Sequence, residues 1–132
     1  IGGPALQFAM PEVGIGFFPD VGGSYILSRL PGKLGRYLGL TGSRVAQSDA
    51  LWSGLITQAS DLADENELLD DLAMGLDLNA VLSNRAAQLQ PGPLQSRSGD
   101  IDRLFSAPSV GDIIGRLKAF PSNTDWIRTE CQ

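Results

Sequence analysis

The segment FAMPEVGIGFFPDVGGSY, residues 8–25, carries most of the chemical information in this chain. One carboxylate, Glu12, follows a short apolar run that ends at Pro11, and a second, Asp20, comes eight residues later. Glycines between and after the two acids allow the backbone to approach a ligand closely. We therefore interpret residues 11–20 as a loop that presents two carboxylates.

Each carboxylate has a functional and an ordinary interpretation. The apolar neighbours of Glu12 would desolvate its carboxylate, which suits an acid or base that works near neutral pH, but Glu12 could also be a plain loop residue. A helix that starts after Asp20 would favour the aspartate anion, yet Asp20 could simply cap that helix. The pair Gly22-Gly23 could cradle an anion, although it belongs to neither a G-x-G-x-x-G motif nor a P-loop.

Short elements are expected on both sides of this loop. A strand over residues 6–10 is ended by proline, and the pattern then predicts a helix after Asp20. Further helices are expected over 33–41 and 46–53, each followed by a glycine, and a short strand over 55–59.

The second half of the chain is expected to be helical. Asp61 to Asp77 contains seven acids and no bases, and leucines recur there at helical spacing, which indicates an amphipathic helix with a solvated acidic face. A metal site is the alternative, but the spacing of the acids matches no calcium loop. Residues 90–99 are expected to form an exposed linker. The remaining predicted helices are 78–89, 101–105, 110–120 with Ser109 as its cap, and 123–130.

Composition excludes several classes of function. The 132 residues carry a formal net charge of -5, which argues against nucleic acid as a partner. The chain has no histidine, which rules out His-based triads and His-ligated zinc within it, and we expect no metal. The single cysteine favours a reducing compartment. The expected location is the cytoplasm in a bacterium or the mitochondrial matrix in a eukaryote. No apolar run reaches the length of a membrane span, so no membrane partner is expected.

Residues 8–58, which include the two carboxylates, resemble the enoyl-CoA hydratase/isomerase (crotonase) family. That family shows a Pro-Glu pair, a Gly-Gly helix start, an Arg-Leu pair, a Leu-Thr-Gly turn and an Ala-x-x-x-Gly-Leu segment. In this chain the corresponding residues are Pro11-Glu12, Gly22-Gly23, Arg29-Leu30, Leu40-Thr41-Gly42, and Ala50 with Gly54-Leu55. The resemblance implies an α/β fold, part of a crotonase-like fold that in this chain is mostly helical with a few short strands.

Asp20 selects a branch within the family. Hydratases usually carry glycine there, whereas the form Phe17 to Gly23, FFPDVGG, is similar to 3-hydroxyisobutyryl-CoA hydrolases. The resemblance implies that Glu12 and Asp20 are the catalytic pair, and that they bind substrate together with Phe17, Phe18, Gly22 and Gly23. The resemblance implies hydrolysis of a short 3-hydroxyacyl-CoA thioester. The implied reaction converts 3-hydroxyisobutyryl-CoA to 3-hydroxyisobutyrate and CoA, a step of valine catabolism. An enoyl-CoA hydratase or isomerase is the alternative. Relatives commonly place a histidine where Gln58 stands, but this departure does not touch the two carboxylates.

The resemblance covers less than a whole enzyme. Residues 1–60 would form a core segment with the active-site loop, and residues 61–132 the helical C-terminal portion of the same partial domain. The backbone donors of the family's oxyanion hole are expected upstream of Ile1, so the chain is interpreted as an internal fragment that is inactive alone and prone to self-association. The implied partner is an acyl-CoA substrate. No cofactor is expected, because coenzyme A is part of that substrate.

Overall fold

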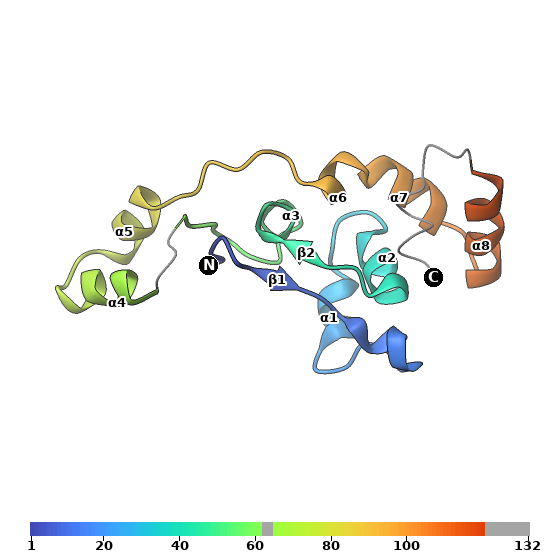
Figure 1. The fold of residues 1–132 in the computed structure, drawn as a ribbon, viewed down its shortest axis with the longest axis horizontal. Helices are drawn as coiled ribbons and strands as arrows, with labels where there is room; N and C mark the ends of the chain where they lie inside the picture. Colours follow the sequence, from blue (N-terminus) through green and yellow to red (C-terminus); the bar gives the residue numbers. More distant parts are fainter. Residues whose placement is uncertain (62–64, 121–132) are drawn as a thin grey trace. The chain divides into compact units, whose positions relative to one another are not determined.

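The computed structural model describes residues 1–61 and 65–120, and their chain segments form two compact units that alternate along the sequence. Among the described residues, the first unit comprises Ile1–Phe8 and those within Val45–Gln95, and the second comprises Ala9–Arg44 and residues 96–120 (Figure 1). The boundary expected at residue 60 divides the chain in sequence order instead, and it stays a prediction.

Two very short strands pair in the first unit. Strand β1 (Gln7–Phe8) runs antiparallel to β2 (Val45–Ala46), with Phe8 opposite Val45. β1 confirms the strand predicted at 6–10, in a shorter form. The strand predicted at 55–59 is wrong: Ile56 donates its N–H to the Ala50 carbonyl at 3.2 Å, so the chain folds back on the preceding helix, and only Ala59 forms a bridge.

Helix α3 (Gln47–Trp52) supplies two buried polar side chains that hold this unit together. Gln47 Nε2 donates to the carbonyls of Gly2 at 2.8 Å and Ser60 at 2.6 Å. Asp49, 1% exposed, accepts from the N–H groups of Leu94 at 3.1 Å and Gln95 at 2.9 Å. Its carboxylate therefore satisfies backbone donors at the start of a helix that have no partner within that helix.

The exposed linker predicted at 90–99 is therefore wrong. Residues 93–96 form helix α6 (Pro93–Ser96), and the next helix already begins at Ser98. Gly92 and Leu94 are buried. A Pro-Gly-Pro sequence is locally typical of a linker, but the hydrogen bonds to Asp49, 45 and 46 residues away in sequence, fix it against α3.

The acidic stretch forms helix α4 (Glu65–Ala73), as predicted, and α5 (Leu78–Asn84) follows it (Figure 1). Arg85 pairs with Asp71 and, at 3.1 Å, with Glu67. The hydrogen bond to Asp71 is the main cause that raises the pKa of Arg85. α5 ends earlier than the predicted residue 89, because Ala87 donates to the Ala59 carbonyl instead of continuing the helix. Among the described residues, no group of three His, Cys, Asp or Glu is placed to hold a metal ion.

Helix α2 (Leu34–Thr41), predicted at 33–41, forms the core of the second unit. Leu34, Tyr37 and Leu38 are at most 2% exposed, and the Tyr37 ring meets the Phe105 ring edge to face at 5.2 Å between centroids. Phe105 belongs to α7 (Ser98–Phe105), whose apolar face adds the buried Ile101 and Leu104 to this core. Stacked or edge-on aromatic pairs of this kind add to the stabilisation from burial alone.

Polar contacts join α7 to both the start and the middle of α2. The Asp102 carboxylate accepts from the Lys33 N–H at 2.6 Å. Arg36 donates to the carbonyls of Phe105 at 2.8 Å and Ala107 at 2.7 Å, which lie at the end of α7. These contacts satisfy backbone groups at helix ends that would otherwise lack partners.

Helix α8 (Val110–Ala119) closes the described part of the chain. Its predicted cap is confirmed, since Ser109 Oγ accepts from the Asp112 N–H at 3.1 Å. The helix predicted at 123–130 lies outside the described residues. Within residues 1–61 and 65–120, no helix is both long and apolar enough to cross a membrane.

The burial of Asp49 gives a testable prediction for stability. Asp49→Ala should lower the free energy of unfolding by about 2–4 kcal/mol, because two buried N–H groups lose a charged acceptor. Denaturant unfolding of the protein that carries this sequence measures the change. The matched control is Asp100→Ala, which removes an exposed ion pair with Arg103 and should cost less than about 1 kcal/mol. Equal losses in the two variants would contradict the role assigned to Asp49.

Candidate functional site

Glu12 lies in a short 3-10 helix, η1 (Pro11–Ile15), rather than in the open loop predicted for residues 11–20. Pro11 suits the first position of a helix, and Gly16, with φ of 73°, ends it in the left-handed region. The Glu12 carbonyl accepts from the Phe17 N–H at 3.0 Å. The backbone that carries Glu12 is therefore fixed by local hydrogen bonds.

The end of α2 supports η1 from one side. At Gly42, the residue after α2, a Cβ atom would lie 3.4 Å from Pro11 Cα and 3.4 Å from Val13 Cγ1. The Leu40-Thr41-Gly42 turn thus lies against the helix that carries Glu12. From the sequence, this turn was recognised only as one of the motifs shared with the family. This contact is tertiary, and the residue pattern alone does not indicate it.

One oxygen of the Glu12 carboxylate has no hydrogen-bond partner among the described residues. The Glu12 side chain is partly buried, and its Oε2 atom is buried with no hydrogen bond from the described residues. Unpaired buried polar atoms are rare and costly in folded proteins, and each calls for a specific explanation. An ordinary loop carboxylate would have both oxygens in water, which is not the arrangement here.

Asp20 precedes helix α1 (Gly23–Leu27) but does not cap it. The N-cap residue is Gly22, with φ of 86°, so the alternative interpretation of Asp20 as N-cap is wrong. The reason is a tight turn before the helix: the Gly23 N–H donates to the Asp20 carbonyl at 2.6 Å, which places Asp20 too early in the chain to cap. The Asp20 side chain is exposed, and its carboxylate accepts no hydrogen bond from the described residues.

Gly23 brings the two acid-bearing segments close to each other. A Cβ atom at Gly23 would lie 2.9 Å from Pro19 Cβ and 3.2 Å from Met10 Sδ. Pro19 directly precedes Asp20, and Met10 lies two residues before Glu12. A side chain at position 23 would therefore displace one of these segments. The role of Met10, 7% exposed, was not predicted from the sequence, because only the folded chain shows this contact.

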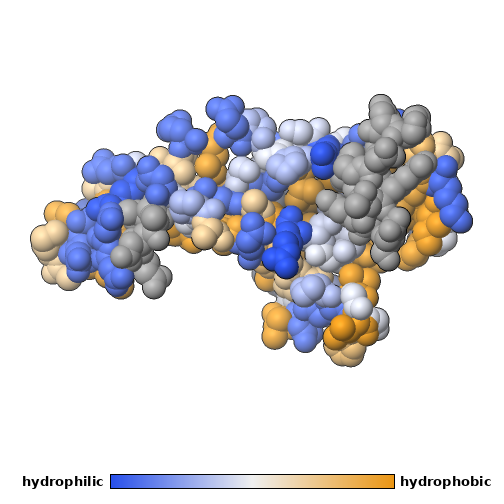
Figure 2. Space-filling view, viewed as in Figure 1, coloured by the Kyte–Doolittle hydropathy of each residue, from blue (hydrophilic) through white to orange (hydrophobic). Residues whose placement is uncertain are grey.

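The other predicted binding residues lie in the same unit as the two acids. Phe17 and Phe18 stack with centroids 4.5 Å apart, and they are 51% and 67% exposed. Val21 and Tyr25 are also exposed. Hydrophobic surface is seen in the region of η1 and α1 (Figure 2). That Phe17, Phe18, Gly22 and Gly23 line one cavity with the carboxylates stays a prediction.

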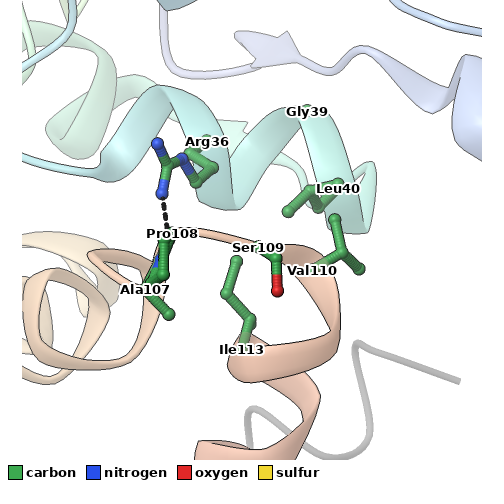
Figure 3. Close-up of a pocket in the computed structure, with 8 residues that line it drawn as sticks. All are labelled: Arg36, Gly39, Leu40, Ala107, Pro108, Ser109, Val110 and Ile113. Carbon is green, nitrogen blue, oxygen red and sulfur yellow. Dashed lines mark hydrogen bonds between the residues drawn. The ribbon is translucent and has the colours of Figure 1, made fainter.

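A separate pocket of about 360 Å³ lies elsewhere in this unit, where α2 faces the start of α8 (Figure 3). Its lining is mostly apolar, with the Arg36 guanidinium held at one side by its hydrogen bond to Ala107. The lining residues are Arg36, Gly39, Leu40, Ala107, Pro108, Ser109, Val110 and Ile113. This pocket contains neither Glu12 nor Asp20.

The unpaired oxygen of Glu12 predicts a measurable cost to stability. Glu12→Met should raise the free energy of unfolding by about 1–2 kcal/mol, because it removes a desolvated oxygen and keeps the length of the side chain. Thermal unfolding of the protein carrying this sequence provides the measurement. Glu67→Met is the control, since Glu67 is exposed and paired with Arg85, and it should bring no gain. If Glu12→Met destabilised the fold, the Glu12 carboxylate would have a structural partner.

Comparisons with known proteins agree with this architecture. Residues 1–132 match the family model described as enoyl-CoA hydratase/isomerase. The chain is 44% identical over 122 residues to 3-hydroxyisobutyryl-CoA hydrolase, mitochondrial, of Danio rerio, and 45% identical over 121 residues to the protein of that name from Xenopus tropicalis. Each alignment covers 84% of this chain and 32% or 31% of the relative, so the chain spans about a third of their length.

The structure is also similar to a solved one. The crystal structure of an enoyl-CoA hydratase from Rhodobacter sphaeroides 2.4.1 matches with a TM-score of 0.79 at 33% identity, over 98% of this chain and 36% of that one. The predicted crotonase-like fold, mostly helical with two short strands among the described residues, is thereby confirmed. With its whole length matched by the family model, the chain belongs to the enoyl-CoA hydratase/isomerase family.

Proposed function

We propose that the protein carrying this sequence hydrolyses the thioester of a short 3-hydroxyacyl-CoA, with 3-hydroxyisobutyryl-CoA as its substrate. The observation that carries the proposal is the buried, unpaired Oε2 of Glu12, eight residues before the exposed carboxylate of Asp20. An acceptor that the fold leaves without a donor is suited to accept a proton or a hydrogen bond from a substrate or water. The name shared by the two relatives at 44% and 45% identity supports the choice of substrate.

Glu12 would act in one of two ways on the thioester carbonyl. As a general base it would take a proton from water while the water oxygen bonds to the carbonyl carbon. As a nucleophile it would form an anhydride with the acyl group, which water then cleaves. In both cases the C–S bond breaks and CoA leaves as the thiol after protonation. The acid product keeps the oxygen from water in the general-base route, and in the anhydride route when water attacks the carbonyl of the acyl group. Backbone N–H donors for the thioester oxygen would come from another part of the protein.

Asp20 would interact with the substrate's 3-hydroxyl group or orient the attacking water. An exposed carboxylate without a hydrogen bond from the described residues can accept from a neutral hydroxyl donor. Its negative charge would repel an anionic group at the same position. Asp20 is therefore suited to a hydroxylated acyl chain, and the hydrolase proposal has a specific role for this residue.

Hydration or isomerisation of an enoyl-CoA is the second candidate. The name of the Rhodobacter sphaeroides structure, an enoyl-CoA hydratase, favours it. That reaction needs Glu12 as an acid and base but gives Asp20 no necessary role.

For the location of the protein we propose the mitochondrial matrix in a eukaryote, in line with the names of the two relatives, and the cytoplasm in a bacterium.

A direct assay separates the two candidates. The protein carrying this sequence should release free CoA thiol from 3-hydroxyisobutyryl-CoA, and Glu12→Gln and Asp20→Asn should each lower kcat/KM by roughly 10²-fold or more. Asp100→Asn, a change at an exposed acid in α7, serves as the control and should leave kcat/KM unchanged. Efficient hydration of crotonyl-CoA together with a harmless Asp20→Gly substitution would show that the protein is a hydratase.

A further inference from the structure

Val21, between Asp20 and Gly22, has a backbone conformation that valine rarely adopts. Its φ is 38°, and it is the sole non-glycine residue with positive φ in the part of the chain that the structure describes. With Gly22 at 86° and the Gly23 N–H bonded to the Asp20 carbonyl, both central residues of the turn have positive φ, as in a type I′ turn. Such turns favour Asn-Gly, and a β-branched residue at the first central position is strained.

Packing against the described residues does not compensate for the strain at Val21. The Val21 side chain is 90% exposed, so its methyl groups bury almost no surface against the described residues. Asparagine or glycine at this position would form the same turn with less strain and would expose less apolar surface. The isopropyl group is therefore better explained by a contact with a molecule outside the described chain than by the stability of the turn.

Its position beside Asp20 indicates what that molecule is. Val21 directly follows Asp20 on an exposed turn, and adjacent Cα atoms lie about 3.8 Å apart, so the backbone positions that bear an apolar group and a carboxylate are neighbours. A ligand that matches both has a hydroxyl group and an alkyl group on neighbouring carbons. A short 3-hydroxyacyl chain with a methyl branch has this chemistry.

We infer that Val21 is a specificity-determining residue, whose isopropyl group contacts the methyl branch of the acyl chain while Asp20 accepts from its hydroxyl. The inference rests on the proposed function, because it names the acyl group that the same site selects. Val21 takes no part in bond making or breaking. Its loss therefore weakens binding of the branched substrate and leaves the chemical step intact.

Two variants separate the strain from the contact. Val21→Asn relieves the strain and removes the methyl groups, so the melting temperature should rise by roughly 2–4 °C while the KM for 3-hydroxyisobutyryl-CoA rises about tenfold. Val21→Thr keeps the β-branch and the strain but replaces one methyl by a hydroxyl, so the KM should rise without a gain in melting temperature. In both variants kcat should stay within about twofold of the wild type.

The unbranched substrate 3-hydroxypropionyl-CoA provides the internal control. It lacks the methyl branch, so its KM should be the same in the wild type and in both variants. Val110→Thr is the matched surface control, because Val110 is also exposed, at 52%, and its substitution should change neither KM.

Three results would overturn the inference. A lower melting temperature in Val21→Asn would mean that another part of the protein buries the isopropyl group. In Val21 variants that still hydrolyse both substrates, the KM for the branched and the unbranched substrate could change equally, or neither KM could change. Either result would exclude a contact between Val21 and the methyl branch. A wild-type protein that releases no CoA from either thioester would instead refute the proposed function, and the inference with it.

Discussion

The burial of helix α2 is the constraint on which the candidate site depends. Leu34, Tyr37 and Leu38 are at most 2% exposed, and Asp102 and Arg36 join the helix to α7 by hydrogen bonds. A packed helix of this kind cannot shift without opening voids or exposing apolar surface. Because η1 lies against the end of α2 at Gly42, the backbone of Glu12 rests on a rigid support.

This support explains how the unit retains two unfavourable features close in sequence. The unpaired oxygen of Glu12 and the strained backbone of Val21 both lower stability, and neither is compensated by its own surroundings. Buried contacts between α2 and α7 offset such costs at a distance. Unfavourable features of this type gather at functional sites, because binding and catalysis need groups that the fold itself leaves unsatisfied.

The sequence predicted the elements whose signals are local. Helices α2, α4 and α8 were predicted from apolar periodicity, glycine stops and the Ser109 cap, and the family was predicted from spaced motifs. Elements that depend on distant partners were missed. β2 forms because β1 lies beside it, and α6 forms because Asp49 binds its first N–H groups. At the site, the two acids were named from the motif, but the burial of Glu12 Oε2 and the turn at Val21 exist only in the folded chain.

In the proposed function Glu12 and Asp20 act together on one acyl-CoA. A crystal structure with a bound, non-hydrolysable thioether analogue of 3-hydroxyisobutyryl-CoA shows whether they do. We predict that the two carboxyl groups lie within about 10 Å of each other on the same side of the acyl chain. Glu12 Oε2 should then accept a hydrogen bond from a water beside the carbonyl carbon or contact that carbon itself, and Asp20 should accept from the hydroxyl group. An analogue bound with Glu12 Oε2 still unpaired, or with Asp20 facing away from the analogue, would show that the two carboxylates do not act together.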